Sequence, residues 1–530
     1  MIRNPILPGF HPDPSICRVG DDYFLATSTF EWYPGVEIHH SRDLANWRLL
    51  RRPLDRAAQL DMRGNPDSCG IWAPCLSHAD GRFWLAYTDV KRFEGNFKDA
   101  HNYLVTAPAI EGPWSDPVYV NSSGFDPSLF HDDDGCKWHL NMLWDHRPHE
   151  GRRHPAFVGI VCQQWDAAAE RLIGAPKLIF EGSPHGLVEG PHLTKRRGWY
   201  YLITAEGGTG YDHAVTLARA RRLDGPYELH PNRHLLTSKD APQARLQRAG
   251  HGQIVETPAG PYLVHLCSRP LAGMRRSPLG RETAIQKCVW RDDDWLYLNH
   301  GGCVPADAVE APFASVAPPA PAAVRTTFAP GALPAEFQWL RTPHSERIFS
   351  LNQRPGKLRL IGRESIGSWF EQAMVARRQQ HFAFRAETQV EFAPTTFQQA
   401  AGLALYYNRR KFHFLALTAN DSGARVLTAM SCLGDADGRL TFPMGEIGLS
   451  DGPVCLQARV DGAALQFAYA LGGGAWMSCG PKLDASLISD EAGGGEHGSF
   501  TGAFVGLCAF DVSGRGVVAD FAYFDYAPED

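Results

Sequence analysis

The chain has 530 residues, 44% hydrophobic and 11% aromatic, and is too long for one ordinary core, so we expect two or three domains. Its formal net charge of −6 includes no block of lysine or arginine, which argues against nucleic acid or an anionic membrane as a partner. No stretch approaches the roughly 20 apolar residues that a membrane-spanning helix needs.

The N-terminal segment MIRNPILPGF shows no charged leader ahead of a long apolar stretch. The twelve cysteines are scattered, and none belongs to a C-x-x-C pair. Without a leader, we expect these cysteines to be reduced and mostly buried rather than disulfide-bonded or bound to zinc. The predicted location is therefore the cytoplasm.

One pattern recurs along the first part of the chain: a short polar pair, an apolar strand, a Gly/Asp turn and an aromatic-rich strand. Successive copies are roughly 60 residues apart. The five copies begin at Asp13, Ala73, Asp126, Glu189 and Gly250. Short aromatic and β-branched strands separated by such turns are typical of all-β structure.

Each repeat is long enough for a four-stranded sheet, with further strands such as Val36–His40 and Ala214–Ala220. Five sheets arranged radially form a five-bladed β-propeller, whose circular closure limits exposed strand edges. We predict this propeller for residues 1–305. The repeats lack the apolar helical periodicity that a doubly wound α/β fold requires between its strands.

Between residues 306 and 326 the composition changes to a Pro/Ala-rich stretch with almost no charge, which we interpret as a semi-rigid linker. Beyond it the strands are longer and alternate more cleanly, as in a sandwich whose strands have one solvated face. We therefore predict an antiparallel β-sandwich over residues 327–530. Its expected strands are Lys357–Gly362, Phe382–Phe392, Gly402–Tyr407, Phe412–Leu417, Val454–Val460, Leu465–Leu471, Ala503–Phe510 and Val517–Tyr526.

Three of the repeats open with a carboxylate at the matching place: Asp13, Asp126 and Glu189. A radial arrangement would bring all three to one axis. Glycoside hydrolysis needs one carboxylic acid to protonate the leaving oxygen and one carboxylate to activate water. A third carboxylate nearby raises the pKa of the acid by like-charge repulsion. The repeat therefore favours a glycoside hydrolase.

Two other interpretations of these acids were weighed. A single Asp-Pro is typical of a turn, where the side chain bonds the local backbone, but three acids in register within a repeat favour a shared function. Clustered carboxylates also attract calcium. We favour hydrolysis because each acid is followed by Pro or Gly-Pro rather than by further oxygen ligands.

Several motifs point to one family. In the first domain they are GFHPDPSICRVGDDYFLATSTFEWYPGVEIHHSRDL, GIWAPCLSHADGRFWLAYTDVK, GFDPSLFHDD, VEGPHL, TAEGGT and PLGRETAIQK. These segments closely resemble the β-xylosidases of glycoside hydrolase family 43. In the second domain GRESIGSWFEQAMVARRQ, FQQAAGLALYYN and SFTGAFVGLCAFDVSG are similar to the concanavalin-like sandwich that follows the propeller in this group. The resemblance thus covers nearly the whole chain.

The resemblance implies a role for each motif residue. Asp13 of the P-D-P motif corresponds to the general base, and Glu189 of E-G-P corresponds to the general acid. Asp126 of G-F-D corresponds to the residue that tunes and orients the acid. Arg281 of G-R-E is similar to an arginine that contacts the sugar and the base. His251, which is expected to have a positioning role, matches a residue near the bottom of the pocket.

A sugar pocket also needs flat apolar surfaces for pyranose C–H faces. Phe30, Trp72 and Trp144 lie in segments that match the family, so we expect them in the pocket wall rather than only in the propeller core. Phe500 resembles the aromatic residue by which the sandwich closes the pocket. The sequence departs from the family at His11, where many members have Asn, which could alter the charge or hydrogen bonding around the base.

The resemblance implies an exo-acting, inverting β-1,4-xylosidase that releases xylose from the non-reducing end of xylo-oligosaccharides. The alternatives are an α-L-arabinofuranosidase on the same scaffold and a non-catalytic carbohydrate-binding propeller. We expect no required cofactor, although in some relatives a structural calcium lies near the residue matched by His251. Relatives also suggest a homo-oligomer, either a dimer or a tetramer.

Overall fold

The computed structural model describes residues 1–147, 156–313, 322–434, 438–493 and 499–529. The chain divides into two compact units. The first consists of Met1–Leu60, Cys69–Arg269 and Arg281–Pro318, and the second of Asp61–Ser68, Pro270–Gly280 and Pro319–Asp530. Part of the predicted linker, residues 314–321, lies outside the described residues. None of the described helices is long and apolar enough to cross a membrane.

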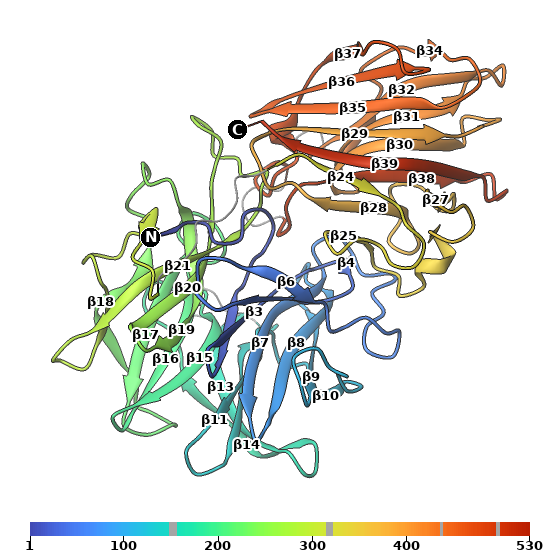
Figure 1. Ribbon diagram of the computed structural model, residues 1–530. Helices are drawn as coiled ribbons and strands as arrows, with labels where there is room; N and C mark the ends of the chain where they lie inside the picture. The colour runs from blue at the N-terminus through green and yellow to red at the C-terminus, as the bar shows by residue number, and fades with distance from the viewer. Residues whose placement is uncertain (148–155, 314–321, 435–437, 494–498, 530) are drawn as a thin grey trace. The chain divides into compact units, whose positions relative to one another are not determined.

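The first unit is a five-bladed β-propeller in which the described residues form five four-stranded antiparallel sheets (Figure 1). Blade one contains β2 (Ser15–Val19), β3 (Asp22–Thr27), β5 (Glu37–Ser41) and β6 (Arg48–Arg51), with β4 (Trp32–Tyr33) between β3 and β5 in the chain. Blade two contains β7 (Gly70–Ala79), β8 (Arg82–Arg92), β9 (Asp99–Ala107) and β10 (Val118–Asn121). Blade three contains β11 (Ser128–His131), β12 (Lys137–Trp144), β13 (Phe157–Asp166) and β14 (Arg171–Phe180).

The remaining blades follow the same plan. Blade four contains β15 (Glu189–Arg196), β16 (Trp199–Glu206), β17 (Ala214–Ala220) and β18 (Glu228–Thr237). Blade five contains β19 (Gln247–Thr257), β20 (Gly260–Ser268), β21 (Glu282–Trp290) and β22 (Leu296–Leu298). The first strands of the blades contact one another in a closed ring, β2 to β7 to β11 to β15 to β19 and back to β2. Ring closure places the starts of all five repeats around one axis.

The Gly/Asp turns of the repeats form tight hairpins. Asp80 and Gly81 join β7 to β8 with φ angles of 53° and 71°, and Ala79 pairs directly with Arg82. Arg197 and Gly198 join β15 to β16 with φ angles of 48° and 73°. Both central residues of a type I′ turn need a positive φ, which matches the right-handed twist of the strands. These turns fix the register of each blade.

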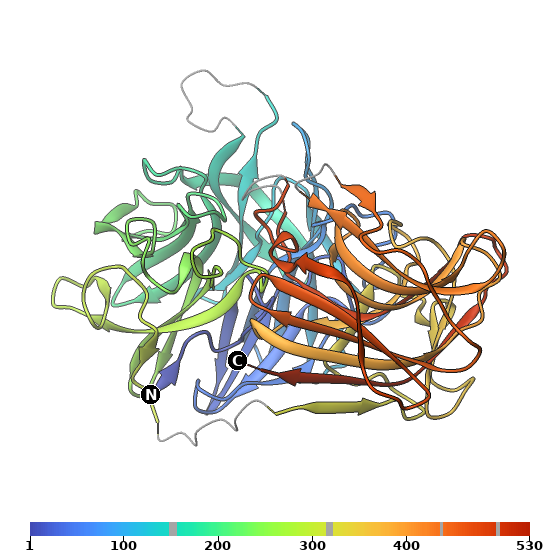
Figure 2. The same cartoon turned by 90° about the horizontal axis from the view of Figure 1, so that it is seen from above.

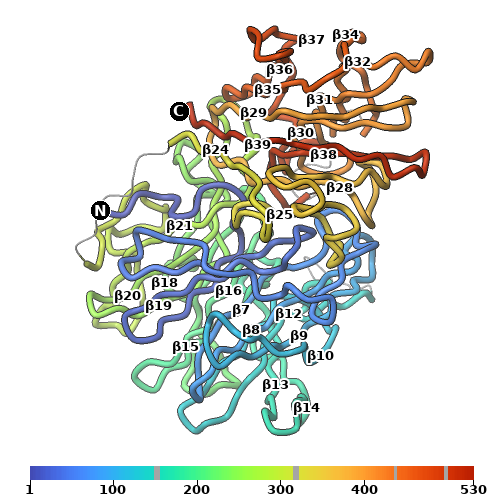
Figure 3. Tube along the Cα trace, turned by 45° about the vertical axis from the view of Figure 1, so that its right-hand side comes forward, coloured from blue at the N-terminus to red at the C-terminus, as the bar shows by residue number. Residues whose placement is uncertain are grey.

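The N-terminal segment is hydrogen-bonded to blade five (Figure 3). β1 (Ile2–Arg3) pairs with β23 (Ala308–Val309), so part of the predicted linker belongs to a sheet. The Asn4 side chain donates to the carbonyls of Ile285 and Ala306 at 2.8 and 2.9 Å, and its Oδ1 accepts from the Ile285 N–H at 2.9 Å. These three bonds hold the start of the chain against β21.

The second unit is a concanavalin-like β-sandwich of two antiparallel sheets (Figure 2). One sheet has the order β26 (Phe349–Ser350), β27 (Leu358–Ile361), β39 (Val518–Pro528), β29 (Ala383–Glu391), β35 (Val454–Asp461), β36 (Ala464–Leu471) and β37 (Met477–Asp484), with β24 (Val324–Thr327) on β39. The other includes β33 (Arg439–Thr441), β32 (Arg425–Leu433), β31 (Lys411–Ala419), β30 (Gln399–Asn408), β38 (Phe504–Asp511), β28 (Ala373–Arg378) and β25 (Phe337–Leu340), with β34 (Ile447–Gly448) on β32. The described helices include the short 3₁₀ turns η1 (Ser345–Arg347) and η3 (Ala485–Leu487).

The core of the sandwich draws on both sheets, for example Leu403 and Leu415 from one and Leu456 and Phe521 from the other. Buried and exposed positions alternate along β29 and β35, as expected for strands with one solvated face. β30 and β31 differ from that expectation, because every residue in them is buried. Their sequences are nearly continuous apolar runs, which is the pattern of strands covered on both faces.

The bonds of Asn4 yield a prediction about stability. The side chain is 3% exposed, and Asn4→Leu would leave the buried backbone groups of Ile285 and Ala306 without their partner. Each such loss costs about 1–3 kcal/mol, so the thermal midpoint of the propeller should fall by several degrees. Differential scanning calorimetry measures this shift. Asn232 is exposed, so Asn232→Leu is the matched control. Equal midpoints for the two variants would show that the Asn4 hydrogen bonds do not stabilise the propeller.

Candidate active site

The three repeat acids lie at the starts of the inner strands. Asp13 and Asp126 each precede their strand, β2 and β11, by two residues, and Glu189 is the first residue of β15. Their exposed fractions are 5%, 7% and 8%, so all three are buried. They also perturb one another electrostatically, which places the three carboxyl groups in one site. The sequence predicted this convergence.

Asp13 has a buried cationic partner and a hydroxyl donor. The Ser28 hydroxyl donates to its Oδ2 at 2.6 Å, and Nη1 of Arg281 donates to its Oδ1 at 2.7 Å. Arg281 is 2% exposed, so this ion pair is shielded from solvent. A buried carboxylate needs such a cation and such hydrogen bonds to remain ionised. The predicted contact between Arg281 and the candidate base is thus present in the structure.

The pKa values of Glu189 and Asp126 are both raised. Burial and then the charge of Asp13 raise the pKa of Glu189 to about 8, although Arg281 and Lys98 act in the other direction. Burial, followed by the charges of Glu189 and Asp13, raises the pKa of Asp126 well above its usual range. Asp126 Oδ2 accepts a 3.0 Å hydrogen bond from the Gly190 N–H, which ties it to the residue after Glu189. Glu189 is therefore protonated at neutral pH.

Lys98 is a site residue that the sequence analysis missed. Its Nζ lies 4.4 Å from the ring centroid of Trp144 and within 6 Å of those of Trp72, Phe93 and Phe125. Nζ also donates to the Phe93 carbonyl at 2.8 Å. Burial lowers the pKa of Lys98 to about 8, while the negative charge of Glu189 acts in the other direction. A cation enclosed by aromatic rings beside the acid thus forms part of the site.

The predicted aromatic residues of the first unit lie around these charged groups. The Phe30 ring is buried, 5.2 Å from the guanidinium carbon of Arg281 and 6.0 Å from the Trp72 ring. Trp72 and Trp144 are half-buried against the propeller core. Trp144 Nε1 donates to the Asn96 carbonyl at 2.9 Å, which fixes the plane of its ring. Phe500 belongs to the second unit, where its N–H donates to the Ser68 hydroxyl, and its closing role stays a prediction.

His251 lies in β19 next to the E-G-P segment. A Cβ on Gly190 would approach Nδ1 and Cε1 of the His251 ring to 2.9 Å, and Gly190 has a φ of 57°. A side chain at position 190 would therefore displace His251 and strain the backbone beside Glu189. Burial lowers the pKa of His251, while the charge of Asp13 acts in the other direction. These contacts agree with a positioning role for His251, which stays a prediction.

His11 participates in a buried network beneath the P-D-P segment. Its Nδ1 lies 2.9 Å from Oε2 of Glu37, whose Oε1 accepts from Nε and Nη2 of Arg52 at 3.0 and 2.5 Å. His11, Glu37 and His39 bring three ligand atoms within 4.8 Å of one another, which is close enough for a metal ion. The Arg52 guanidinium already neutralises Glu37, however, and this disfavours a second cation. The network instead anchors the segment that carries Asp13.

Comparisons with known proteins cover the whole chain. The model of the Glycosyl hydrolases family 43 matches residues 2–296. The model of the Beta xylosidase C-terminal Concanavalin A-like domain matches residues 325–527. The two matches correspond to the two folds described above.

Individual relatives match over their full length. The Xylosidase/arabinosidase 43B of Humicola insolens is 60% identical over 99% of this chain and 98% of its own. A Xylan 1,3-beta-xylosidase of a Vibrio species is 46% identical over 99% of both chains. The crystal structure of the xylan beta-1,4-xylosidase of Bacillus halodurans C-125 superposes with a TM-score of 0.95 at 49% identity, covering 99% of this chain and 100% of that one.

The contacts of Lys98 yield a prediction about charge. Lys98→Met keeps an unbranched apolar side chain among the rings but removes the cation that lowers the pKa of Glu189. The pKa of Glu189 should therefore rise above about 8. Carbon NMR titration of protein labelled at the glutamate δ-carbon measures it, with the signal assigned from Glu189→Gln. The exposed Lys177→Met should leave the value unchanged, and a lower pKa in Lys98→Met would contradict the predicted effect of Lys98.

Proposed function

Because the chain belongs to glycosyl hydrolase family 43, we propose that it is an exo-acting, inverting β-1,4-xylosidase. It removes xylose from the non-reducing end of xylo-oligosaccharides. The names of the relatives support the xylosidase activity, and the Bacillus halodurans structure supports the β-1,4 linkage. The site itself supports the mechanism.

The observation that carries the proposal is the contrast between two buried carboxyl groups. Asp13 forms a buried ion pair with Arg281, whereas burial, followed by the charge of Asp13, raises the pKa of Glu189 to about 8. Acid–base catalysis of glycoside cleavage needs one carboxyl group that donates a proton and another that accepts a proton from water. Among the described residues the Glu189 carboxyl forms no hydrogen bond, so its proton is available to a substrate.

In the proposed reaction Glu189 donates its proton to the leaving glycosidic oxygen while Asp13 removes a proton from water on the opposite face of the sugar. Water attack from that face inverts the anomeric configuration, which requires carboxyl groups about 6.5–9.5 Å apart. The absence of a direct hydrogen bond between Asp13 and Glu189 in the described structure supports a separated pair. Asp126 positions the acid through its bond to the Gly190 N–H.

Substitution of either acid tests these roles. Asp13→Asn and Glu189→Gln keep the size of each side chain but remove the base and the acid. Positioned acid–base groups contribute about 10²- to 10⁴-fold, so kcat on xylobiose should fall by at least that factor. The exposed Asp21→Asn and Glu181→Gln are matched controls. Near-normal turnover by either active-site variant would refute its assigned role.

Product analysis separates the related activities. Proton NMR of the first-formed xylose should show the α-anomer from a β-linked substrate, and the β-anomer would refute inversion. The Humicola relative is named both a xylosidase and an arabinosidase, and the Vibrio relative is named a 1,3-beta-xylosidase. An α-L-arabinofuranoside and 1,3-linked xylobiose are therefore the substrates for comparison. We expect the highest kcat/KM on 1,4-linked xylobiose. Binding without hydrolysis would indicate a carbohydrate-binding protein.

We also propose that the reaction needs no metal. The side chains around His251 do not fit a calcium site, because calcium prefers oxygen ligands and the His251 ring lies 6.4 Å from the ring of another histidine, His192. Burial, followed by the charges of His251, Arg281 and Arg248, lowers the pKa of nearby His213. A field of this sign disfavours another cation.

A chelator tests this proposal directly. Dialysis against EDTA should leave kcat/KM on xylobiose unchanged, and added calcium should have no effect. A loss of activity that calcium restores would contradict the proposal. Thermal midpoints measured on the same samples report whether an ion is bound at all, since any ion that binds the folded protein stabilises it.

A cytoplasmic location and a homo-oligomeric state, dimer or tetramer, are further parts of the proposal. All twelve cysteines are free thiols in the structure and most are buried, which suits a reducing compartment. Imported short oligosaccharides would be the natural substrates there. Cell fractionation and light scattering test the two points separately.

A further inference from the structure

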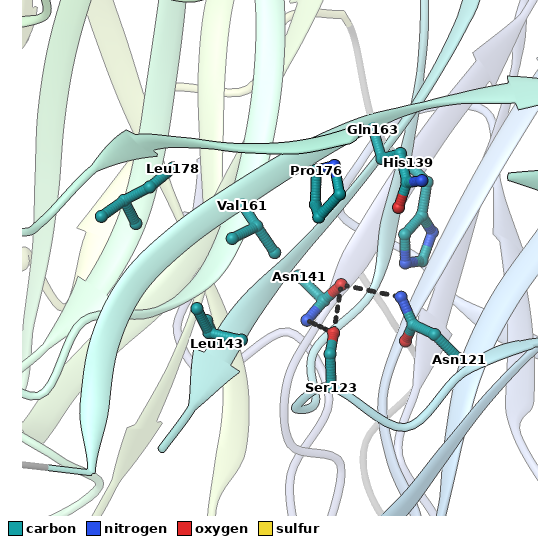
Figure 4. Close-up of a pocket in the computed structure, with 9 residues that line it drawn as sticks. All are labelled: Asn121, Ser123, His139, Asn141, Leu143, Val161, Gln163, Pro176 and Leu178. Carbon is teal, nitrogen blue, oxygen red and sulfur yellow. Dashed lines mark hydrogen bonds between the residues drawn. The ribbon is translucent and has the colours of Figure 1, made fainter. Parts of the chain in front are cut away.

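A second pocket lies on the side of the propeller, between blades two and three. Its volume is about 280 Å³, and it is lined by residues from β10, β12, β13 and β14 and by Ser123, which lies between β10 and β11 (Figure 4). Ligand pockets in proteins measure about 300–1,000 Å³, so this one suits a single small molecule. A disaccharide would exceed it.

One wall of the pocket is polar and already ordered. The Asn141 Nδ2 donates to the Ser123 hydroxyl at 3.1 Å, and the Asn121 Nδ2 donates to Oδ1 of Asn141 at 3.3 Å (Figure 4). Oδ1 of Asn121 accepts in turn from Asn102 at 2.7 Å. The amides are therefore held in place before any ligand binds. Such preorganisation lowers the entropic cost of binding.

Two further polar groups of this wall have bonding capacity left. His139 is 4% exposed, and its Nε2 has no hydrogen-bond partner among the described residues. Gln163 uses its Nε2 on the Gly174 carbonyl at 2.7 Å, while its Oε1 accepts no bond from the described residues. A buried polar atom without a partner is costly, so a ligand hydroxyl at His139 would be favoured.

The other wall is aliphatic and consists of Leu143, Val161, Pro176 and Leu178. No lining residue has an acidic side chain, lysine or arginine, and burial lowers the pKa of His139 to about 4, so this histidine is neutral near pH 7. A neutral surface offers no counter-charge to a phosphate, a carboxylate or an amine. The pocket therefore selects an uncharged ligand with hydroxyls on one edge and C–H groups on the other.

β12 separates this pocket from the acid site. Its odd residues, His139, Asn141 and Leu143, face the pocket, while Leu140, Met142 and Trp144 pack with the propeller core. Successive side chains of a strand point to opposite faces. The Ser123 carbonyl accepts from the Trp144 N–H at 2.9 Å, so the pocket adjoins the segment that leads to Asp126 without sharing its lining with the acids.

We propose that this pocket is a second, non-catalytic binding site for a neutral monosaccharide of pentose size, such as xylose. The hydroxyls contact His139 and Gln163, and the C–H edge lies against the aliphatic wall. Because the pocket lacks an aromatic platform, binding is weak, in the millimolar range. The site is independent of the hydrolytic assignment and remains if that assignment fails.

Equilibrium dialysis with radiolabelled xylose counts the sites on the full-length protein. The intact protein should bind two xylose molecules per chain, one in each site. Leu178→Trp, at a rim residue that is 43% exposed, fills the pocket, and Gln163→Leu removes a polar contact. Each variant should bind one molecule fewer. Gln164→Leu is the matched control, since Gln164 is the next residue of β13 and is absent from the pocket lining.

Both pocket variants should keep the kcat of the unchanged protein. Crystals soaked in xylose give a second readout, with density expected against Gln163 and His139. If neither variant changes the number of bound molecules, the pocket proposal is wrong. If the intact protein binds one molecule and Leu178→Trp binds none, the pocket proposal stands, and turnover of xylobiose decides the xylosidase proposal separately, so the two are distinguishable.

Discussion

The site depends on burying three carboxyl groups together. Each of Asp13, Asp126 and Glu189 loses most of its hydration, and a buried carboxyl group needs a compensating partner. Arg281 is that partner at Asp13, to which it donates a 2.7 Å charge-assisted hydrogen bond. Burial, followed by the charge of Asp13, raises the pKa of Glu189 to about 8. Burial and the Asp13–Arg281 ion pair together therefore set the electrostatics of the site.

The propeller supplies the backbone that makes this burial feasible. Asp13 and Asp126 have φ angles of 55° and 56°, in the left-handed region that non-glycine residues seldom adopt. Such strain persists only where the surrounding structure over-determines it, and it clusters at functional sites. The ring of inner strands and the Asn4 bonds to β21 provide this constraint. The fold thus holds the acids where local preference alone would not.

The sequence allowed prediction of the repeated strands and of most sandwich strands, but of little that depends on tertiary contacts. The strand Ala214–Ala220 was predicted with its observed bounds, and the register of the acids followed from their shared place in the repeat. Lys98 was missed because it lies outside every repeat opening, and only the fold gathers four aromatic rings around it. β37 was missed because its sequence, MSCGPKLD, contains Gly and Pro and lacks alternation. Pairings such as His11 with Glu37 depend on tertiary contacts that no local pattern reveals.

The pKa of Glu189 in Asp13→Asn tests the central claim most directly. Carbon NMR titration of the glutamate δ-carbon should give about 8 in the unchanged protein and a lower value in the variant. The charge of Asp13 raises the pKa of Glu189 and the cation of Arg281 lowers it, so losing the Asp13 charge shifts the pKa downward. An equal or higher pKa in the variant would show that Asp13 does not act on Glu189 and would contradict the account.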